Sequence, residues 1–168
     1  MPVGWVTGAL VLFLARPSTP SLVVGMSLAA VGESLRIWAS GHLEKTLMLA
    51  TGGPYAHTRN PLYLGSVLMA LGMAAAAASP WVLAVAASYL LAFYPVVIRK
   101  EEVLLREKFG PDYAEWAASV PPFLPRLTPG GPRASRFEWR RVRRNREWRA
   151  VLALPPVAAL LWARTVLH

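Results

Sequence analysis

Residues 52–65 read Gly52-Gly53-Pro54-Tyr55-Ala56-His57-Thr58-Arg59-Asn60-Pro61-Leu62-Tyr63-Leu64-Gly65, and this stretch decides the fold. Its glycines and first proline predict a turn, because glycine adopts positive φ at little cost and tolerates close backbone approach. Asn60-Pro61 predicts a second boundary, since the residue before proline avoids helical geometry and proline suits the first turn of a helix. Polar and aromatic side chains fill the interval, so we interpret the stretch as a ligand-binding loop between two hydrophobic helices.

The composition around this loop is that of a membrane protein. Hydrophobic residues make up 55% of the 168 residues, charged residues only 16%, and the mean hydropathy is +0.38. The apolar residues gather in blocks, several of them near the length of about 20 residues that crosses a bilayer as a helix. We therefore predict an all-α integral membrane protein with about five transmembrane helices. Cysteine is absent, which excludes disulfides and cysteine nucleophiles.

We expect a single membrane domain over residues 1–168, divided by its turns. The apolar stretch 3–15 is short for a full crossing, and Pro155-Pro156 predicts a break or kink in the last apolar stretch, 150–167. Gly110-Pro111 predicts the end of an amphipathic helix over 99–109, before a short helix over 112–119. The expected segments are N-terminal helices (1–40), the binding loop (41–61), a helical hairpin (62–98), a cytoplasmic cap (99–132), and a basic interfacial helix plus a last apolar helix (133–168).

The basic residues predict the orientation. Of the 18 Lys and Arg residues, 15 fall in 41–61 and 99–149, which lie on one side if the helices alternate. The positive-inside rule places that side in the cytoplasm, and we expect a bacterial or archaeal inner membrane. The arginine-rich segment 136–149 fits either nucleic acid or lipid phosphate. Its interleaved aromatics and apolar neighbours favour membrane lipids, with no nucleic-acid partner.

Two pairs within the helices are open to more than one interpretation. Glu33 and Arg36 share a helical face inside an apolar stretch, and they either serve a functional cavity or form an ion pair that orients the helix. Gly65 and Gly72 lie seven apart on one face, which favours close helix packing.

Few residues outside the loop could carry chemistry. The three histidines lack the spacing of a metal site, and phosphate-loop and nucleophile motifs are absent. Glu101-Glu102 follows a hydrophobic helix, where two carboxylates either bind a cationic group such as an amine or sulfonium or form a solvated acidic turn.

Together these motifs resemble a known enzyme family. Gly53-Pro54-Tyr55, Arg59-Asn60-Pro61 and Glu101-Glu102, with the intervening Tyr63 and Gly65, resemble the isoprenylcysteine carboxyl methyltransferases, and membrane phospholipid N-methyltransferases look similar over the same pieces. The resemblance covers about residues 46–126. It implies an integral membrane enzyme that uses S-adenosylmethionine in a cytoplasm-facing pocket and takes a lipophilic or prenylated acceptor from the bilayer.

The resemblance also implies site residues. Glu101 would bind the amino group of the cofactor, Arg99 would act toward the acceptor, and Arg99 and Glu102 are the expected catalytic residues. The family's acceptor arginine aligns with Val97, which makes Arg99 the nearest candidate, and Asn60 stands where the family most often has histidine. The expected cofactor-binding residues are Leu47, Met48, Leu49, Ala50, Tyr55, His57, Asn60, Pro61, Leu62, Tyr63 and Glu101.

Two rival functions stay open at this point. One is N-methylation of an amine on a phospholipid headgroup, and the other is a lipid-binding or structural membrane protein without activity. Calorimetry with S-adenosylmethionine separates the enzymes from the structural protein. The base lability of the transferred methyl group separates a carboxyl ester from an N-methyl group.

Overall fold

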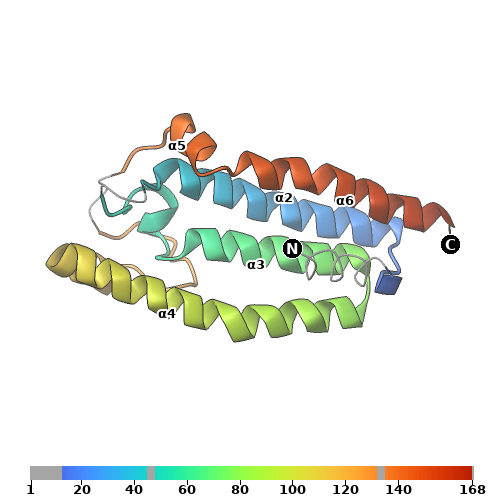
Figure 1. Cartoon of the computed structure of the whole chain (residues 1–168), viewed down its shortest axis with the longest axis horizontal. Coiled ribbons are helices and arrows are strands. Elements are labelled where there is room, and N and C mark those ends of the chain that lie inside the picture. Colours follow the sequence, from blue (N-terminus) through green and yellow to red (C-terminus); the bar gives the residue numbers. More distant parts are fainter. Residues whose placement is uncertain (1–12, 45–47, 132–134, 168) are drawn as a thin grey trace.

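The computed structural model describes residues 13–44, 48–131 and 135–167, and all regular structure among them is helical, which confirms the predicted all-α class (Figure 1). Most of the predicted stretch 3–15 lies outside the described residues. Three helices are long and apolar enough to cross a membrane, namely α2, α4 and α6, and α3 is a shorter apolar helix. The elements are α2 (Thr19–His42), the 3₁₀ turn η1 (Gly53–Ala56), α3 (Pro61–Ala77), α4 (Pro80–Ser119), α5 (Trp139–Arg144) and α6 (Trp148–Leu167).

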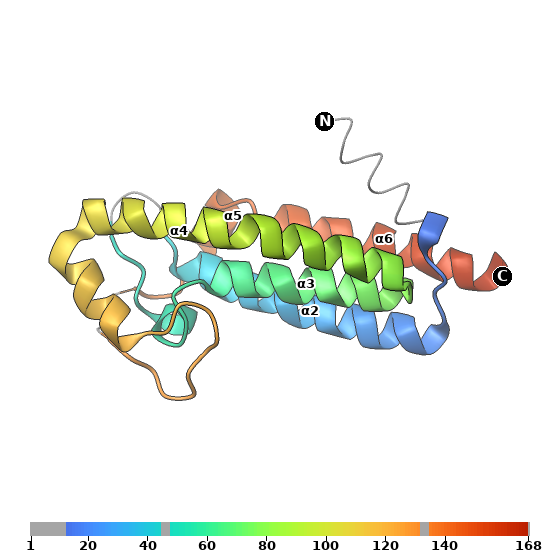
Figure 2. The ribbon, with the colours of Figure 1, turned by 90° about the horizontal axis from the view of Figure 1, so that it is seen from below.

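The long helices lie side by side, with α6 beside α2 and α4 beside α3 (Figures 1 and 2). The C-terminus of α2, the N-terminus of α3, the second half of α4 and the short helix α5 meet at one end of the bundle, which also carries residues 48–60. We call this the loop end. The opposite end, where α3 turns into α4, is the far end.

Glycines bring α2 and α3 into close contact. A Cβ at Gly72 would lie 2.5 Å from the backbone nitrogen of Ala29, and one at Gly32 would lie 2.6 Å from the carbonyl oxygen of Gly65. Such distances leave no room for a side chain, so the two backbones pack directly against each other. The predicted packing role of Gly65 and Gly72 is thereby confirmed.

The predicted helix end at Gly110 is also confirmed. Gly110 has φ 52° and ψ −121°, and this break lets the last turns of α4 fold back toward the loop (Figure 2). Tyr113 and Trp116 lie beyond the break and are almost fully buried, at 1% and 2% exposure. They pack with Tyr55 in the apolar cluster of the loop end.

The prediction of one basic helix over 136–149 was wrong, and so was the prediction of a break in the last helix. Only Trp139–Arg144 is helical within 136–147, and a turn with Arg146 at φ 61° separates this short helix from α6. The last helix then continues through Pro155 and Pro156 without the predicted break. Each proline removes one donor from the ladder, but the remaining intrahelical bonds maintain the helix, as is common in membrane spans.

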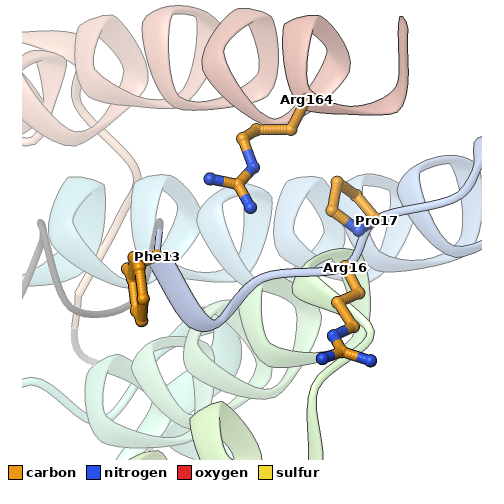
Figure 3. Close-up of a pocket in the computed structure, with 4 residues that line it drawn as sticks. All are labelled: Phe13, Arg16, Pro17 and Arg164. Atoms are coloured by element: carbon orange, nitrogen blue, oxygen red, sulfur yellow. The ribbon is translucent and has the colours of Figure 1, made fainter. Parts of the chain in front are cut away.

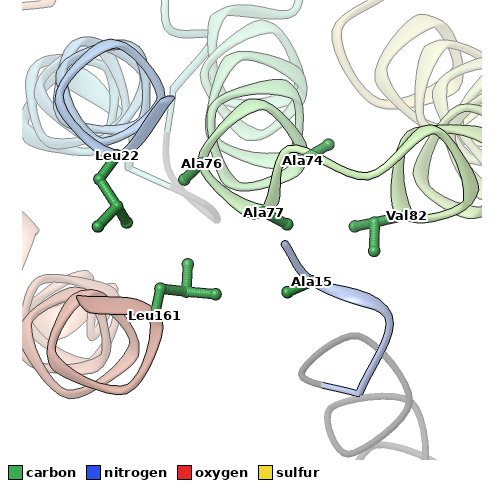
Figure 4. Close-up of a cluster of buried hydrophobic side chains, with 7 residues drawn as sticks. All are labelled: Ala15, Leu22, Ala74, Ala76, Ala77, Val82 and Leu161. Carbon is green, nitrogen blue, oxygen red and sulfur yellow. The ribbon is translucent and has the colours of Figure 1, made fainter. Parts of the chain in front are cut away.

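A second apolar cluster holds the four long elements together at the far end. It is formed mainly by small side chains, which allow α2, α3, α4 and α6 to converge (Figure 4). Its buried members are Ala15, Leu22, Ala74, Ala76, Ala77, Val82 and Leu161.

Candidate functional site

The loop 48–60 is held from three sides. The backbone N–H of Gly52 donates to Ser135 Oγ at 2.9 Å, and Gly53, at φ 58°, lies against the ring of His42. From α4, Trp116 Nε1 donates to the carbonyl oxygen of Tyr55 at 3.2 Å. The glycine pair indicated a close backbone approach, but nothing in the sequence identified Ser135, His42 or Trp116 as the neighbours.

A proline-rich strap, residues 121–126, runs along the loop. Arg59 N–H donates to the carbonyl oxygen of Pro121 at 2.9 Å, and Arg126 N–H donates to that of His57 at 3.0 Å. Side chains add to this pairing, because Asn60 Nδ2 donates to Pro122 at 2.7 Å and His57 Nδ1 lies 2.8 Å from the carbonyl oxygen of Arg126. His57 and Asn60, predicted to contact the cofactor, therefore hold the strap against the loop.

The carboxylates after the fourth apolar stretch reach the loop, as the alternating helices predicted. Glu101 Oε2 accepts a hydrogen bond from the Tyr63 hydroxyl at 2.8 Å, and Glu102 Oε1 pairs with Arg59 at 3.0 Å. Glu102 is thus neutralised by a loop arginine that the predicted site did not include. Glu101 is exposed, and its Oε1 has no hydrogen-bond partner among the described residues.

The remaining predicted residues differ in how deeply they are buried. Ala50 is buried, and Leu49 and Leu62 pack against the cluster around Tyr55 at the loop end. Arg99 instead lies exposed on α4 and forms no hydrogen bond or ion pair within the described part of the chain. Met48 is 42% exposed, Pro61 is buried at the start of α3, and Leu47 lies outside the described residues.

The buried phenols of the loop end are poor acids. Burial raises the pKa of Tyr55, and the negative charges of Glu101 and Glu147 raise it further. Burial also raises the pKa of Tyr113, with the hydrogen bond to Arg59 acting in the opposite direction. Both side chains stay neutral near pH 7, so they can shape a site or donate a hydrogen bond without adding charge.

A second polar cluster adjoins the start of α3. Arg36 of α2 contacts the Ser66 hydroxyl, lies 3.4 Å from the Leu62 carbonyl oxygen and pairs with Glu147 at 2.8 Å. Its Nε lies 3.8 Å from Glu33 Oε2, so the predicted Glu33–Arg36 pair exists as the weaker of the two. Glu147 is 111 residues from Arg36 in the sequence, and no spacing rule could have predicted it.

The far end contains a hollow of about 450 Å³ lined by Phe13, Arg16, Pro17 and Arg164 (Figure 3). The Arg164 guanidinium lies 3.3 Å from the carbonyl oxygen of Ala15, which helps to hold α6 there. This hollow is separated from residues 48–60 by the length of the bundle, so it is not part of the predicted site.

Comparison with known proteins gives the family. Residues 20–112 match the phospholipid methyltransferase family, and the chain belongs to that family. This family lies in the same superfamily as the isoprenylcysteine carboxyl methyltransferases, but membership in the latter is not confirmed. The coarser prediction of a membrane methyltransferase is therefore supported.

Two curated relatives carry names from metal resistance. The chain is 41% identical over 108 residues to the cobalt-zinc-cadmium resistance protein CzcN of Cupriavidus metallidurans, a match that covers 63% of this chain and 48% of the relative. It is 34% identical over 108 residues to the nickel-cobalt-cadmium resistance protein NccN of Alcaligenes xylosoxydans xylosoxydans, covering 63% and 49%. The match thus spans about half the length of each relative. No solved structure matches the chain.

Proposed function

We propose that this chain is an S-adenosylmethionine-dependent methyltransferase that acts on a lipophilic acceptor. One observation carries the proposal: two elements far apart in the sequence meet at the loop end through Tyr63–Glu101 and Arg59–Glu102. The family membership supplies the reaction class. The concentration of Lys and Arg in 41–61 and 99–149 supports a cytoplasm-facing site in an inner membrane.

The residues at the loop end suit the cofactor. Since Arg59 already neutralises Glu102, Glu101 is the carboxylate with an oxygen left for an ammonium group. Apolar Leu49 and Ala50 lie beside the Tyr55 cluster, where a flat aromatic base can pack. When bound, S-adenosylmethionine supplies an electrophilic methyl group on a positively charged sulfur. The part of this chain is to hold the donor, exclude water and position the acceptor.

The acceptor is better argued as an amine than as the carboxyl group that the resemblance implies. A carboxylate acceptor needs a cationic partner, but Arg59 and Arg36 each already bind a glutamate. Of these three arginines only Arg99, the predicted acceptor arginine, has no glutamate partner among the described residues, so the carboxyl alternative depends on this exposed residue of α4. We therefore favour a lipophilic amine, such as a phospholipid headgroup, and keep the prenylated carboxyl acceptor as the alternative.

The names of the two relatives do not determine the function of this chain. They describe proteins that the match covers to about half of their length. Within the described residues, no group of three or more His, Cys, Asp or Glu is placed to hold a metal ion. The proposed function rests on the methyltransferase family and the loop-end geometry.

Calorimetry on the detergent-solubilised chain tests the cofactor assignment. We expect S-adenosylmethionine and its demethylated product to bind, and Glu101→Gln to weaken binding by about 1.5–3 kcal/mol, the range for hydrogen bonds to charged groups. Glu107→Gln is the matched control, because Glu107 is exposed on the same helix. Absence of binding by the wild-type chain would refute the enzyme assignment.

A transfer assay identifies the acceptor class. The chain is incubated with membrane lipid extract and S-adenosylmethionine labelled in its methyl group, and the labelled product is treated with alkali. An N-methyl product retains its label, whereas a methyl ester releases it. Release of most of the label would favour the carboxyl alternative.

A further inference from the structure

The polar cluster formed by Glu33, Arg36 and Glu147 contains two acidic side chains but only one basic side chain. Glu33 and Glu147 are nearly buried, at 4% and 7% exposure, and Arg36 is the cation between them. Two carboxylates therefore share one guanidinium in a part of the bundle where α2 and α6 are apolar enough to span a membrane. Charge buried in such surroundings is costly unless it is paired.

Glu33 is the carboxylate left without a close partner. The two terminal nitrogens of Arg36 are engaged by Ser66 and the Leu62 carbonyl on one side and by Glu147 on the other. Arg36 Nε lies 3.8 Å from Glu33, beyond hydrogen-bond distance. Neither Glu33 oxygen has a hydrogen-bond partner within the described ranges. An unpartnered buried carboxylate requires a cation with N–H donors to complete it.

We propose that Glu33, together with Glu147, binds the ammonium group of a lipophilic amine, the acceptor of the methyl group. Because only a neutral amine has the lone pair that can accept a methyl group, Glu33 takes one N–H proton before the transfer, and S-adenosylmethionine would leave as its neutral demethylated product. This inference rests on the proposed function, because it assigns the acceptor class to specific residues. One ammonium would bring a second positive charge and several N–H donors to a cluster that has a single guanidinium for two carboxylates. Arg36 is then a positioning residue that orients Glu147 and joins the site to the start of α3.

The surroundings of the cluster fit a ligand that arrives from the bilayer. Just beyond Glu147, α6 presents Leu152 at 64% exposure and Val151 at 40% exposure. In the most apolar 18-residue stretch of α6, only 6% of the residues are buried by the rest of the chain. The cluster therefore adjoins a helix that has few packing contacts and can face lipid. An alkyl chain can lie along that surface while its amine reaches the carboxylates.

The cluster also adjoins the proposed cofactor site. Arg36 contacts the carbonyl of Leu62, one residue before Tyr63, which binds Glu101. The negative charges of Glu101 and Glu147 both act on the buried Tyr55 hydroxyl. One carboxylate suits the amino group of the donor and the other suits that of the acceptor, and both raise the pKa of the same buried phenol.

Binding of a simple amphiphile tests the proposal. The full chain in detergent is titrated with octylamine, with octanol and octanoate as the neutral and anionic comparisons, and binding is followed by calorimetry and thermal unfolding. We expect octylamine alone to bind and to raise the unfolding temperature. Glu33→Gln should weaken octylamine binding by about tenfold or more while leaving S-adenosylmethionine binding unchanged. Glu115→Gln, at an exposed position of α4, is the matched control.

Each outcome decides the proposal. Octylamine binding that is equal in wild type and Glu33→Gln overturns it, as does equal binding of octylamine and octanol. A pH-dependent stability that Glu33→Gln removes, without octylamine binding, would show that Glu33 holds a proton instead. If Glu33→Gln does not fold, Glu33→Asp retains the charge at a shorter reach and should bind octylamine measurably more weakly. If the wild-type chain does not bind S-adenosylmethionine, the proposed function is refuted. If it binds S-adenosylmethionine but not octylamine, only this site is refuted.

Discussion

The helices α2 and α3 pack in a different way from the flanking helices α4 and α6. Between α2 and α3 the glycines allow backbone contact. In the most apolar 18-residue stretch of α2, 33% of the residues are buried. In the corresponding stretches of α4 and α6, only 6% of the residues are buried. The α2–α3 pair is thus the closely packed part of the bundle, and few residues in the apolar stretches of the flanking helices are buried.

The flanking helices are fixed near their ends. On α4 the buried side chains are Val82 at the far end and Tyr113 and Trp116 at the loop end. On α6, Leu161 is buried in the far-end cluster, and Glu147 binds Arg36 just before the helix begins. The middle of each helix is free to face lipid. This arrangement combines a fixed loop end with lateral surfaces along which a lipophilic molecule can approach.

Breaking the α2–α3 contact should have the largest effect. Gly72→Leu places a side chain where even a Cβ meets the backbone of Ala29, so α2 and α3 must separate. We expect a loss of at least about 3 kcal/mol, enough to prevent recovery of folded protein in detergent. Ala75→Leu, at an exposed position of the same helix, is the control and should leave the yield and unfolding temperature nearly unchanged. A well-folded Gly72→Leu would show that the helices are not in backbone contact.

Removing the attachment of α4 to the loop should have an effect of similar or slightly smaller size. Trp116→Ala deletes a ring that is 2% exposed and the donor to the Tyr55 carbonyl. The cost should be about 3 kcal/mol or more, measured by thermal unfolding, and S-adenosylmethionine affinity should fall with it. Trp81→Ala removes a ring that is 69% exposed and should cost much less. Equal effects of the two substitutions would contradict the buried attachment.

The ion pair between the loop and α4 should contribute less. A double-mutant cycle of Arg59→Ala and Glu102→Ala should give a coupling of about 1 kcal/mol, because the side chains are 16% and 28% exposed and solvent screens the pair. The Arg140–Glu138 pair, at 3.8 Å with side chains 83% and 41% exposed, should give almost none. Coupling of the same size at both sites would mean that Arg59 and Glu102 do not join loop and helix.

The smallest effect should appear at the contact of α5 with Glu44, two residues beyond the end of α2, and it should depend on pH. The hydrogen bond from Arg144 holds the pKa of Glu44 below its ordinary value, with the charge of Arg141 acting in the same direction. The unfolded state therefore binds more protons, and this stabilisation is complete above the unfolded pKa of about 4.3 and lost as the pH falls through the lower folded pKa. Glu44→Gln should lower the unfolding temperature at pH 7 and have less effect at pH 3. A constant difference between the two pH values would contradict the prediction.

The local features of this fold could be predicted from the sequence, but the pairing of distant residues could not. Turn residues revealed the loop and the break at Gly110, and alternation of the helices placed Glu101 on the side of the loop. Helical spacing indicates which residues share a face, but it does not indicate which faces meet. Arg59 pairs with Glu102 and Arg36 pairs with Glu147. These pairings depend on which side chains come within reach of each other once the helices have packed.

For the site, too, the sequence indicated which side chains are polar but not which groups they contact. Chemical type suggested His57 and Asn60 as ligand contacts, yet their hydrogen bonds go to the strap over 60 residues away. The basic run 136–149 suggested one interfacial helix, but Arg141 is 8% exposed and binds Glu44. A polar side chain in a loop can bind a ligand or satisfy a buried carbonyl, and only the three-dimensional neighbours distinguish the two.

The break at Gly110 has a stereochemical consequence. No atom lies within 4 Å of the place where a Cβ would stand, so the position restricts the backbone torsion and not the volume. Mirror-image residues prefer positive φ, whereas ordinary L-residues do not. A semisynthetic chain with D-alanine at 110 should keep the hooked end of α4 closed over Tyr55, and L-alanine should pull it open.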